Sequence, residues 1–256
     1  MMSLTAPATL RWMALLASLS VMQGTLELLA WRRHLADDGT WRWRTLSREL
    51  RWLSPLLAYR PFLMVLAVRV GCALLLLAGV HGATLPLLWI TSLLANIRFR
   101  GSTNGGSDMM LMVVLSALTV AHLGASSPIV VQGALVYVAA QSVMSYFIAG
   151  VVKLIDAPWR RGVALASFVA TPHFGTPIAL RQLLSRPAVA FAASWAVILF
   201  ECAFPLALTG ARAAALFVAL AACFHLGNVA AFGLNRFLLA WAASWPAVLH
   251  TATLLR

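Results

Sequence analysis

The chain has 256 residues, of which 62% are hydrophobic and 10% are charged. A soluble domain carries about 25% charged residues, so this composition excludes a soluble protein. The formal net charge of +12 would suit a nucleic-acid-binding protein, but no basic module or recognition motif accompanies it, and we expect no nucleic-acid partner.

Apolar stretches long enough to cross about 30 Å of hydrocarbon recur along the whole chain. Each is continuously apolar rather than alternating, which indicates helices. We expect an all-α polytopic membrane protein with a single transmembrane domain over residues 1–256 and no soluble domain. The eight expected membrane-spanning helices lie at about 9–31, 61–80, 83–97, 108–124, 130–154, 187–208, 211–233 and 237–255.

Residues 32–60 connect the first two of these helices and contain seven arginines. Trp41, Trp43 and Trp52 lie among the arginines. This composition is typical of an amphipathic helix in the membrane interface, with its aromatic rings at headgroup depth. We expect that interfacial helix at about 40–58.

The positive charges are unevenly divided between the two sides of the membrane. If residues 32–60 are cytoplasmic, the connections on that side carry fifteen of the nineteen cations, and both termini lie outside. The longest irregular stretch, about 159–187, falls on the same side. We expect it to lie across the membrane face as a lid or a re-entrant segment.

Lys153 is the single lysine of the chain and ends a long apolar stretch that begins at Ile129. An arginine keeps its proton at any useful pH, whereas a buried lysine can lose it and act as a base. An ionisable residue inside a membrane is a candidate functional residue. The alternative is that this lysine only extends from a helix end to the lipid headgroups.

A polar stripe leads along the same helix to this lysine. Ser142, Tyr146, Gly150 and Lys153 share one helix face at spacings of four, four and three residues. Such a stripe can line a ligand pocket. It can equally form a helix–helix seam, in which glycine and serine allow close approach and polar side chains bond across.

The seventh expected helix carries His225, Asn228 and Phe232 on one face. An imidazole and a carboxamide can bind a carbonyl, quinone or phenolate oxygen, or they can bond neighbouring helices together. His122 lies near the end of the fourth helix, where a single histidine is usually bonded to a neighbour.

Arg69 and Glu201 are ionisable residues deep in expected helices. Because an isolated charge there is costly, their opposite signs predict that they pair. The histidines and cysteines are not spaced as ligands of one metal ion, and we expect no metal cofactor.

Two segments resemble vitamin K-dependent gamma-glutamyl carboxylase. The segment around its catalytic lysine is similar to Ser-Tyr-Phe-Ile-Ala-Gly-Val-Val-Lys-Leu-Ile-Asp-Ala-Pro-Trp, residues 145–159. A second membrane segment of the enzyme is similar to Phe224-His-x-x-Asn-x-x-x-Phe232, and His122 falls where the enzyme has an Asn-His pair. The chain thus resembles the horizontally transferred transmembrane (HTTM) domain family over about residues 10–250.

The resemblance implies a mechanism. In the carboxylase, oxygenation of a vitamin K hydroquinone to its epoxide generates a strong base, which removes a proton from a glutamate side chain that then adds carbon dioxide. The resemblance implies that Lys153 deprotonates a vitamin K-type hydroquinone as general base, with His225 and His122 as further catalytic residues. The cofactor-binding residues that we expect are Tyr146, Gly150, Asn228 and Phe232.

The carboxylase also has a large extramembrane domain that grips its protein substrate, and this sequence has no counterpart of it. Small bacterial members of the family include the sporulation-delaying-protein B group, which is needed to mature a secreted peptide toxin. We therefore expect a multi-pass protein of the bacterial inner membrane, surrounded by lipids, that modifies or matures a peptide as a carboxylase-like lyase. A soluble or membrane partner protein would replace the missing domain. The alternative is a non-catalytic scaffold or quinone-binding subunit of a larger complex.

Overall fold

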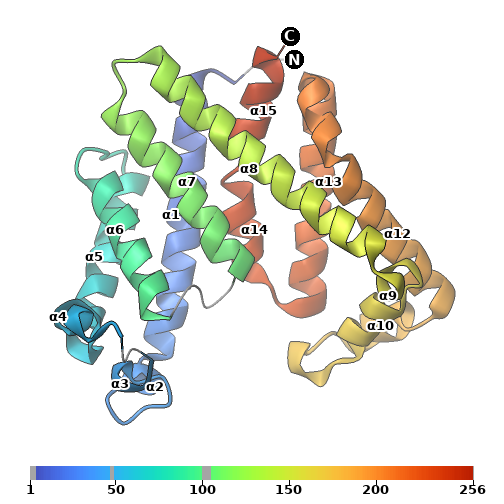
Figure 1. Cartoon of the computed structure of the whole chain (residues 1–256), viewed down its shortest axis with the longest axis horizontal. Helices are drawn as coiled ribbons and strands as arrows, with labels where there is room; N and C mark the ends of the chain where they lie inside the picture. Colours follow the sequence, from blue (N-terminus) through green and yellow to red (C-terminus); the bar gives the residue numbers. More distant parts are fainter. Residues whose placement is uncertain (1–3, 47–48, 100–104, 256) are drawn as a thin grey trace. The chain divides into compact units, whose positions relative to one another are not determined.

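The computed structural model describes residues 4–46, 49–99 and 105–255 (Figure 1). Within these ranges the chain is helical and contains no strand, as the sequence predicts. Seven segments of the described chain are long and apolar enough to cross a membrane. They are Ala6–Ala30 (α1), Tyr59–Leu77 (α5), Gly105–Leu123 (α7), Pro128–Ile155 (α8), Pro187–Thr209 (α12 and η3), Ala211–Phe232 (α13) and Asn235–Leu254 (α14 and α15).

The expected span at 83–97 forms helix α6, Thr84–Arg98, but is not among the seven. Its 15 residues rise about 22 Å, which is short of the hydrocarbon thickness of about 30 Å. Helix α6 packs against both α5 and α7. The indole nitrogen of Trp89 ties it to α7 by donating to the hydroxyl of Ser116 at 2.8 Å.

The chain divides into two compact units, each described here by itself. The N-terminal unit comprises Leu10–Ala134 and Leu239–Ala243. The C-terminal unit comprises Met1–Thr9, Leu135–Leu238 and Ser244–Arg256. The described chain thus consists of two packed groups of helices.

The arginine-rich connection in the N-terminal unit is not one amphipathic helix. It contains the short helices Arg32–Leu35 (α2), Trp43–Leu46 (α3), Arg51–Leu53 (η1) and Ser54–Leu57 (α4). Pro55 starts a new helical turn in α4, and the extended backbone at Ala58 separates α4 from α5. Two positions of the expected helix, 47 and 48, lie outside the described residues. Composition alone predicted the membrane interface but not these breaks.

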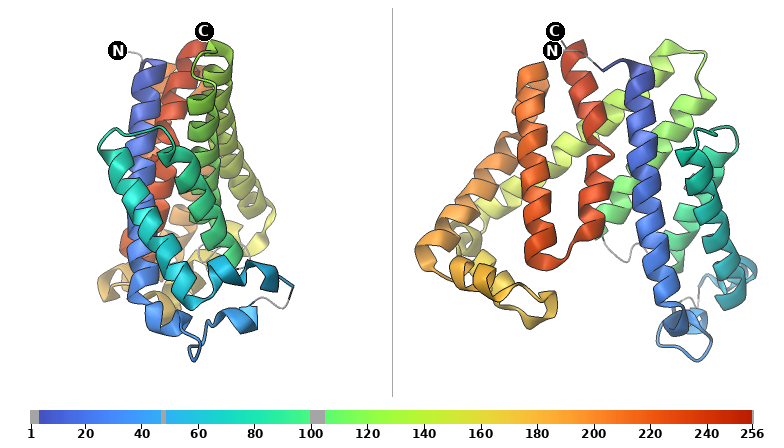
Figure 2. Two further views of the ribbon diagram at one scale, coloured as in Figure 1. Left: turned by 90° about the vertical axis from the view of Figure 1, so that its left-hand side faces the viewer. Right: turned by 180° about the vertical axis from the view of Figure 1, so that it is seen from behind.

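The C-terminal unit contains the second part of α8, followed by helices α12, α13 and α15. Helix α12 is Pro187–Ala203, η3 is Phe204–Thr209, α14 is Asn235–Ala242 and α15 is Trp245–Leu254. Within this unit α13 lies between α12 and α15 (Figures 1 and 2). The helices of this unit place the polar residues of α8 against residues of α12, α13 and α15.

The stretch expected to be irregular, about 159–187, contains a series of short helices. They are Ala157–Arg160 (α9), Val163–Ala170 (α10), Pro172–Phe174 (η2) and Ile178–Leu184 (α11). Gly162 turns the chain between α9 and α10 with a φ of +75°, and a β-carbon there would lie 2.6 Å from the backbone nitrogen of Phe191. The turn therefore requires glycine twice, for its conformation and for its close contact with α12.

Candidate functional site

The polar stripe on α8 faces the interior of the C-terminal unit. Ser142 and Tyr146 are buried, and each hydroxyl bonds a side chain on another helix. The oxygen of Ser142 lies 3.1 Å from the hydroxyl oxygen of Ser244. The hydroxyl of Tyr146 lies 2.8 Å from Nε2 of His225 on α13. Of the two alternatives for this stripe, the contacts favour a bonded helix–helix seam at these positions.

Helix α8 approaches α12 closely at Gly150. A β-carbon at this position would lie 2.6 Å from the backbone nitrogen of Cys202 and 2.8 Å from the β-carbon of Glu201. Any larger residue would push the two helices apart. The space beside Gly150 is therefore filled by α12, and this close approach brings Glu201 next to Lys153.

Lys153 and Glu201 form an ion pair. The ammonium nitrogen of Lys153 lies 3.0 Å and 2.7 Å from the two carboxylate oxygens, and 3.4 Å from the carbonyl oxygen of Ala149. The Lys153 side chain is 18% exposed and that of Glu201 is 3% exposed. The ring of Trp159 lies 5.3 Å from the ammonium nitrogen, within cation–π distance. Lys153, rather than Arg69, is thus the ion-pair partner that the structure gives to Glu201.

Aromatic rings surround the bond between Tyr146 and His225. The ring of Tyr146 stacks on Phe204 with centroids 4.0 Å apart. Phe237 and Trp245 each lie 6.0 Å from the His225 ring. His225 is 1% exposed. Because buried polar groups are costly unless bonded, an apolar enclosure of this kind holds the phenol–imidazole pair in one arrangement.

The other expected site residues lie elsewhere. Asn228 is half-buried on α13. Phe232 ends α13 and packs its ring against Phe174, with centroids 5.4 Å apart. His122 belongs to the N-terminal unit, where its ring stacks on His81 at 6.4 Å. Of the expected residues, Tyr146 and His225 thus meet directly, and Lys153 lies on the same helix as Tyr146 but bonds Glu201.

Two cavities of about 370 Å³ each flank α10 in the C-terminal unit. The residues that line the first cavity are Asp156, Trp159, Ala164, Ser167, Phe168 and Thr171. Trp159 is common to this cavity and to the surroundings of Lys153. The volume falls within the range of small-molecule sites, and two aromatic rings with two hydroxyls suit an aromatic ligand that carries oxygen atoms. We call it the Trp159 cavity.

Sequence reasoning missed Glu201 and Trp159 as neighbours of Lys153. Glu201 was noted as an intramembrane acid but assigned to Arg69, because sign alone does not distinguish one cation from another. Trp159 lies six residues after Lys153 in the segment that resembles the carboxylase, so its position was a usable signal. No spacing in the sequence connects Lys153 to a residue 48 positions away.

No group of three or more histidine, cysteine or carboxylate residues in the described ranges is arranged to hold a metal ion. A family model described as the HTTM domain matches residues 123–251. The match includes Lys153, Glu201 and His225, whereas His122 precedes it by one residue. No protein with a curated description and no solved structure matches the chain significantly.

Proposed function

The chain belongs to the HTTM family, and from this membership we propose that it is a membrane enzyme that binds a quinol and uses Lys153 as general base. The observation that carries the proposal is the ion pair of Lys153 and Glu201 within the family match. It gives the one lysine of the chain a buried acceptor for the proton that it must lose before it can act as a base.

The first step is a proton transfer inside this ion pair. Glu201 accepts a proton from the Lys153 ammonium, which leaves a neutral amine beside a neutral carboxylic acid. Keeping two charges away from water costs free energy. Burial therefore favours the neutral pair relative to the ion pair. Lys153 can then accept a proton from a hydroxyl placed next to it. Glu201 is thus a positioning residue and a proton acceptor for the base.

The Trp159 cavity supports the binding part of the proposal. Its wall contains the ring of Trp159, whose other neighbours are Lys153 and Phe168. When bound, a quinol supplies an acidic hydroxyl and the electrons for a reaction with oxygen. Trp159 and Phe168 offer flat surfaces for an aromatic ring, and the hydroxyls of Ser167 and Thr171 can accept hydrogen bonds.

The remaining parts of the proposal come from the family resemblance. By that resemblance, the reaction of the quinol with oxygen generates a base that modifies or matures a peptide, in a bacterial inner membrane. His225, bonded to Tyr146, would act as a second catalytic residue, together with His122. Asn228 and Phe232 stay proposed cofactor contacts, whereas the space beside Gly150 is filled by α12. A partner protein would hold the peptide.

The test is a mass-spectrometric assay of the purified full-length protein, given vitamin K hydroquinone and oxygen. We expect quinone epoxide from the wild type and a loss of at least 100-fold in Lys153→Ala, because general-base catalysis contributes about 10²–10⁴-fold. The matched control is Val152→Ala, which shortens the exposed preceding residue of α8 and should keep wild-type activity. Epoxide formation that is equal in both variants would overturn the assignment of Lys153.

A second candidate function is a non-catalytic scaffold, and the close contact at Gly150 favours it. The space beside the polar stripe at Gly150 is occupied by α12 and is not open to a ligand. A scaffold subunit should tolerate Lys153→Ala in its complex but lose its partner when Gly150→Leu separates α8 from α12. An enzyme should instead stay assembled and become inactive in Lys153→Ala.

A further inference from the structure

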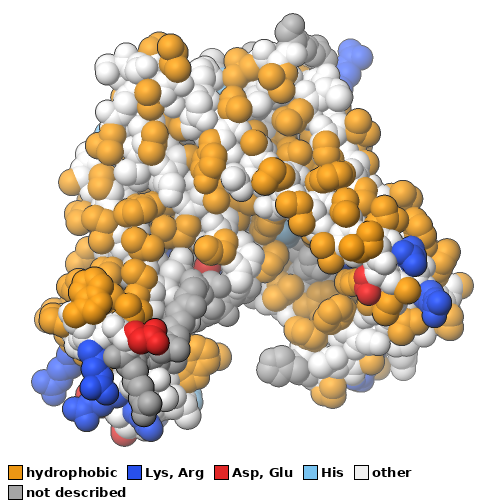
Figure 3. Space-filling model, viewed as in Figure 1, with side chains coloured by type: hydrophobic (Ala, Val, Ile, Leu, Met, Phe, Trp, Pro, Cys, Tyr) orange, Lys and Arg blue, Asp and Glu red, His pale blue; other side chains and the backbone are white. Residues whose placement is uncertain are grey.

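The connection between α1 and α5 carries a surface of arginine and tryptophan side chains in the N-terminal unit. We call it the arginine–tryptophan surface. Its members in the described chain are Arg32, Arg33, Arg42, Arg44, Arg51, Trp31, Trp41 and Trp52. Figure 3 shows Lys and Arg side chains gathered where Figure 1 draws α2, α3 and α4. Residues 31–60 contain seven arginines against three acidic residues, so the segment is strongly basic.

The position of this surface follows from the two helices that it joins. Helix α1 ends at Ala30 and α5 begins at Tyr59, and both are long and apolar enough to cross a membrane. A segment that joins the ends of two membrane spans starts and finishes at the depth of the lipid headgroups. Its side chains therefore lie at the depth of the lipid headgroups.

All five arginines of the surface are exposed. Among the described residues none of them forms an ion pair, although Arg32 donates to the carbonyl oxygen of Leu29 at 3.3 Å. Their positive charges are therefore not neutralised by a carboxylate within the described chain. The tryptophans are also exposed, at 72% for Trp52, 56% for Trp31 and 37% for Trp41. Exposed indole rings beside arginines match a membrane interface, where one end of the ring meets acyl chains and the other meets water.

A buried arginine from α6 holds this segment in a fixed shape. Arg98 is fully buried and donates to the carbonyl oxygens of Trp41 at 2.9 Å and of Leu35 at 3.4 Å. Its guanidinium lies 5.4 Å from the ring centroids of both Trp43 and Phe62. Burial lowers the pKa of Arg98 to about 10, partly opposed by the charge of Asp37, so the group stays positive at neutral pH.

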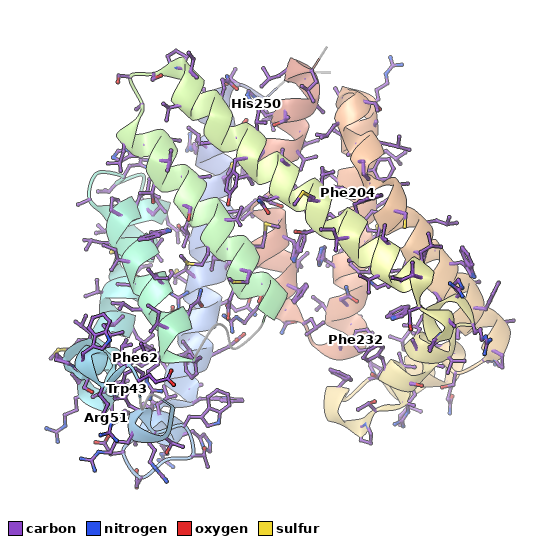
Figure 4. All side chains as sticks on the ribbon, viewed as in Figure 1. Trp43, Arg51, Phe62, Phe204, Phe232 and His250 are labelled. Carbon is purple, nitrogen blue, oxygen red and sulfur yellow. The ribbon has the colours of Figure 1, made fainter. Side chains whose placement is uncertain are left out.

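The side of the segment that faces α5 is packed. The indole nitrogen of Trp43 donates to the hydroxyl of Ser54 at 2.9 Å, and Leu35, Leu53 and Phe62 are buried with Trp43 in one apolar cluster. Figure 4 labels Trp43 and Phe62 within this cluster and Arg51 on the same segment. The arginines are therefore presented outward by a folded support rather than by a free loop.

We propose that the arginine–tryptophan surface is a binding site for the headgroups of anionic phospholipids. The guanidinium groups donate bidentate hydrogen bonds to the lipid phosphates, and the exposed indoles lie at the boundary with the acyl chains. The positive charge and the direct connection to two membrane spans favour a lipid over an acidic peptide. An acidic peptide would not account for exposed tryptophans at headgroup depth. This site is independent of the proposed quinol chemistry, because it lies in the other unit.

The test uses full-length protein in detergent and native mass spectrometry, with phosphatidylglycerol and phosphatidylcholine of identical acyl chains as probes. We expect at least threefold more retained phosphatidylglycerol than phosphatidylcholine, and a decrease as salt is raised. The triple variant Arg42→Gln, Arg44→Gln and Arg51→Gln should lose this preference. The matched control removes three exposed arginines of the C-terminal unit, by Arg160→Gln, Arg161→Gln and Arg186→Gln, and should keep it.

Three results would overturn the proposal: equal retention of the two lipids, an equal loss in both triple variants, or displacement of phosphatidylglycerol by an acidic peptide that binds more tightly. A second measurement guards against a folding defect in the triple variant. Trp52→Phe keeps an aromatic ring but removes the most exposed indole of the surface. Brominated phosphatidylglycerol should quench less fluorescence in this variant than in the wild type, and an unchanged quench would also contradict the site.

Discussion

The ammonium nitrogen of Lys153 lies 2.7 Å and 3.0 Å from the two carboxylate oxygens of Glu201, on a helix that begins 34 residues later at Pro187. The pair combines the one lysine of the chain with one of its seven acidic residues. Close packing at Gly150 sets its geometry, because the backbone of α12 fills the space that a side chain would need. The geometry of the ion pair therefore depends on the close contact between α8 and α12.

Glu201→Gln should destabilise the protein and abolish quinol oxidation. The change leaves Lys153 beside a neutral amide, and an uncompensated charge in a buried site costs about 2–3 kcal/mol here, since the lysine is partly exposed. Thermal unfolding in detergent measures the first effect and the epoxide assay the second.

A double variant separates these two effects. Lys153→Gln with Glu201→Gln removes both charges and should recover most of the lost stability, while activity stays absent. If the double variant is as unstable as Glu201→Gln alone, the ion pair is not the source of the stability loss.

Gly150→Ala should destabilise the seam between α8 and α12 by about 1–3 kcal/mol, because the added methyl group would meet the backbone of Cys202. The matched control is Gly133→Ala on the same helix, where nothing lies within 4 Å of the new β-carbon. That change should stabilise the protein by about 0.5–1 kcal/mol, since alanine is the better helix former. Melting temperatures that shift in the same direction would contradict the close approach.

Tyr146→Phe should cost about 1–3 kcal/mol, because it removes the hydroxyl that lies 2.8 Å from Nε2 of the buried His225. The ring and its stacking on Phe204 are kept, so the loss reports on the interactions of the hydroxyl, with His225 and with Trp245. Tyr137→Phe on the same helix is the control, because that side chain is 44% exposed. Denaturant unfolding should leave the control within about 0.5 kcal/mol of the wild type.

Sequence patterns predicted the helical membrane fold because long apolar stretches leave few alternatives to a helix in hydrocarbon. The predicted span at 83–97 forms a 15-residue helix that is not among the seven segments long and apolar enough to cross a membrane. The sequence patterns also predict one interfacial helix, where the described residues form the separate short helices α3, η1 and α4. Averages of hydropathy and charge locate such a segment in the sequence. They do not indicate the backbone conformation of its single residues.

For the candidate site, the sequence singles out individual residues but not the contacts between them. The sequence singles out Tyr146 and His225 separately, but a separation of 79 positions gives no sign that they bond each other. Glu201 was singled out and given the wrong partner. Tertiary contacts depend on which helix faces meet, and a helix such as α13, apolar around most of its surface, does not indicate which face that is.

The loop after α10 is fastened to the end of α13 by one buried hydroxyl, and this attachment gives a last prediction. Thr176 donates to the carbonyl oxygen of Ala231 at 2.7 Å. Thr176→Val keeps the shape of the side chain and removes the donor, so the loop should open more often while the rest of the protein stays folded. Arg181 follows in the chain and provides a tryptic site that reports the opening.

Limited trypsin digestion of the full-length protein in detergent should therefore cut Thr176→Val about three- to tenfold faster than the wild type at Arg181, which corresponds to a hydrogen bond worth about 1 kcal/mol. Thr171→Val is the matched control, because that exposed hydroxyl bonds only the Ser167 carbonyl of its own helix, at 2.9 Å. Equal cleavage rates in the two variants would show that the loop is held by its apolar contacts, such as Phe174 with Phe232, and not by the Thr176 hydroxyl.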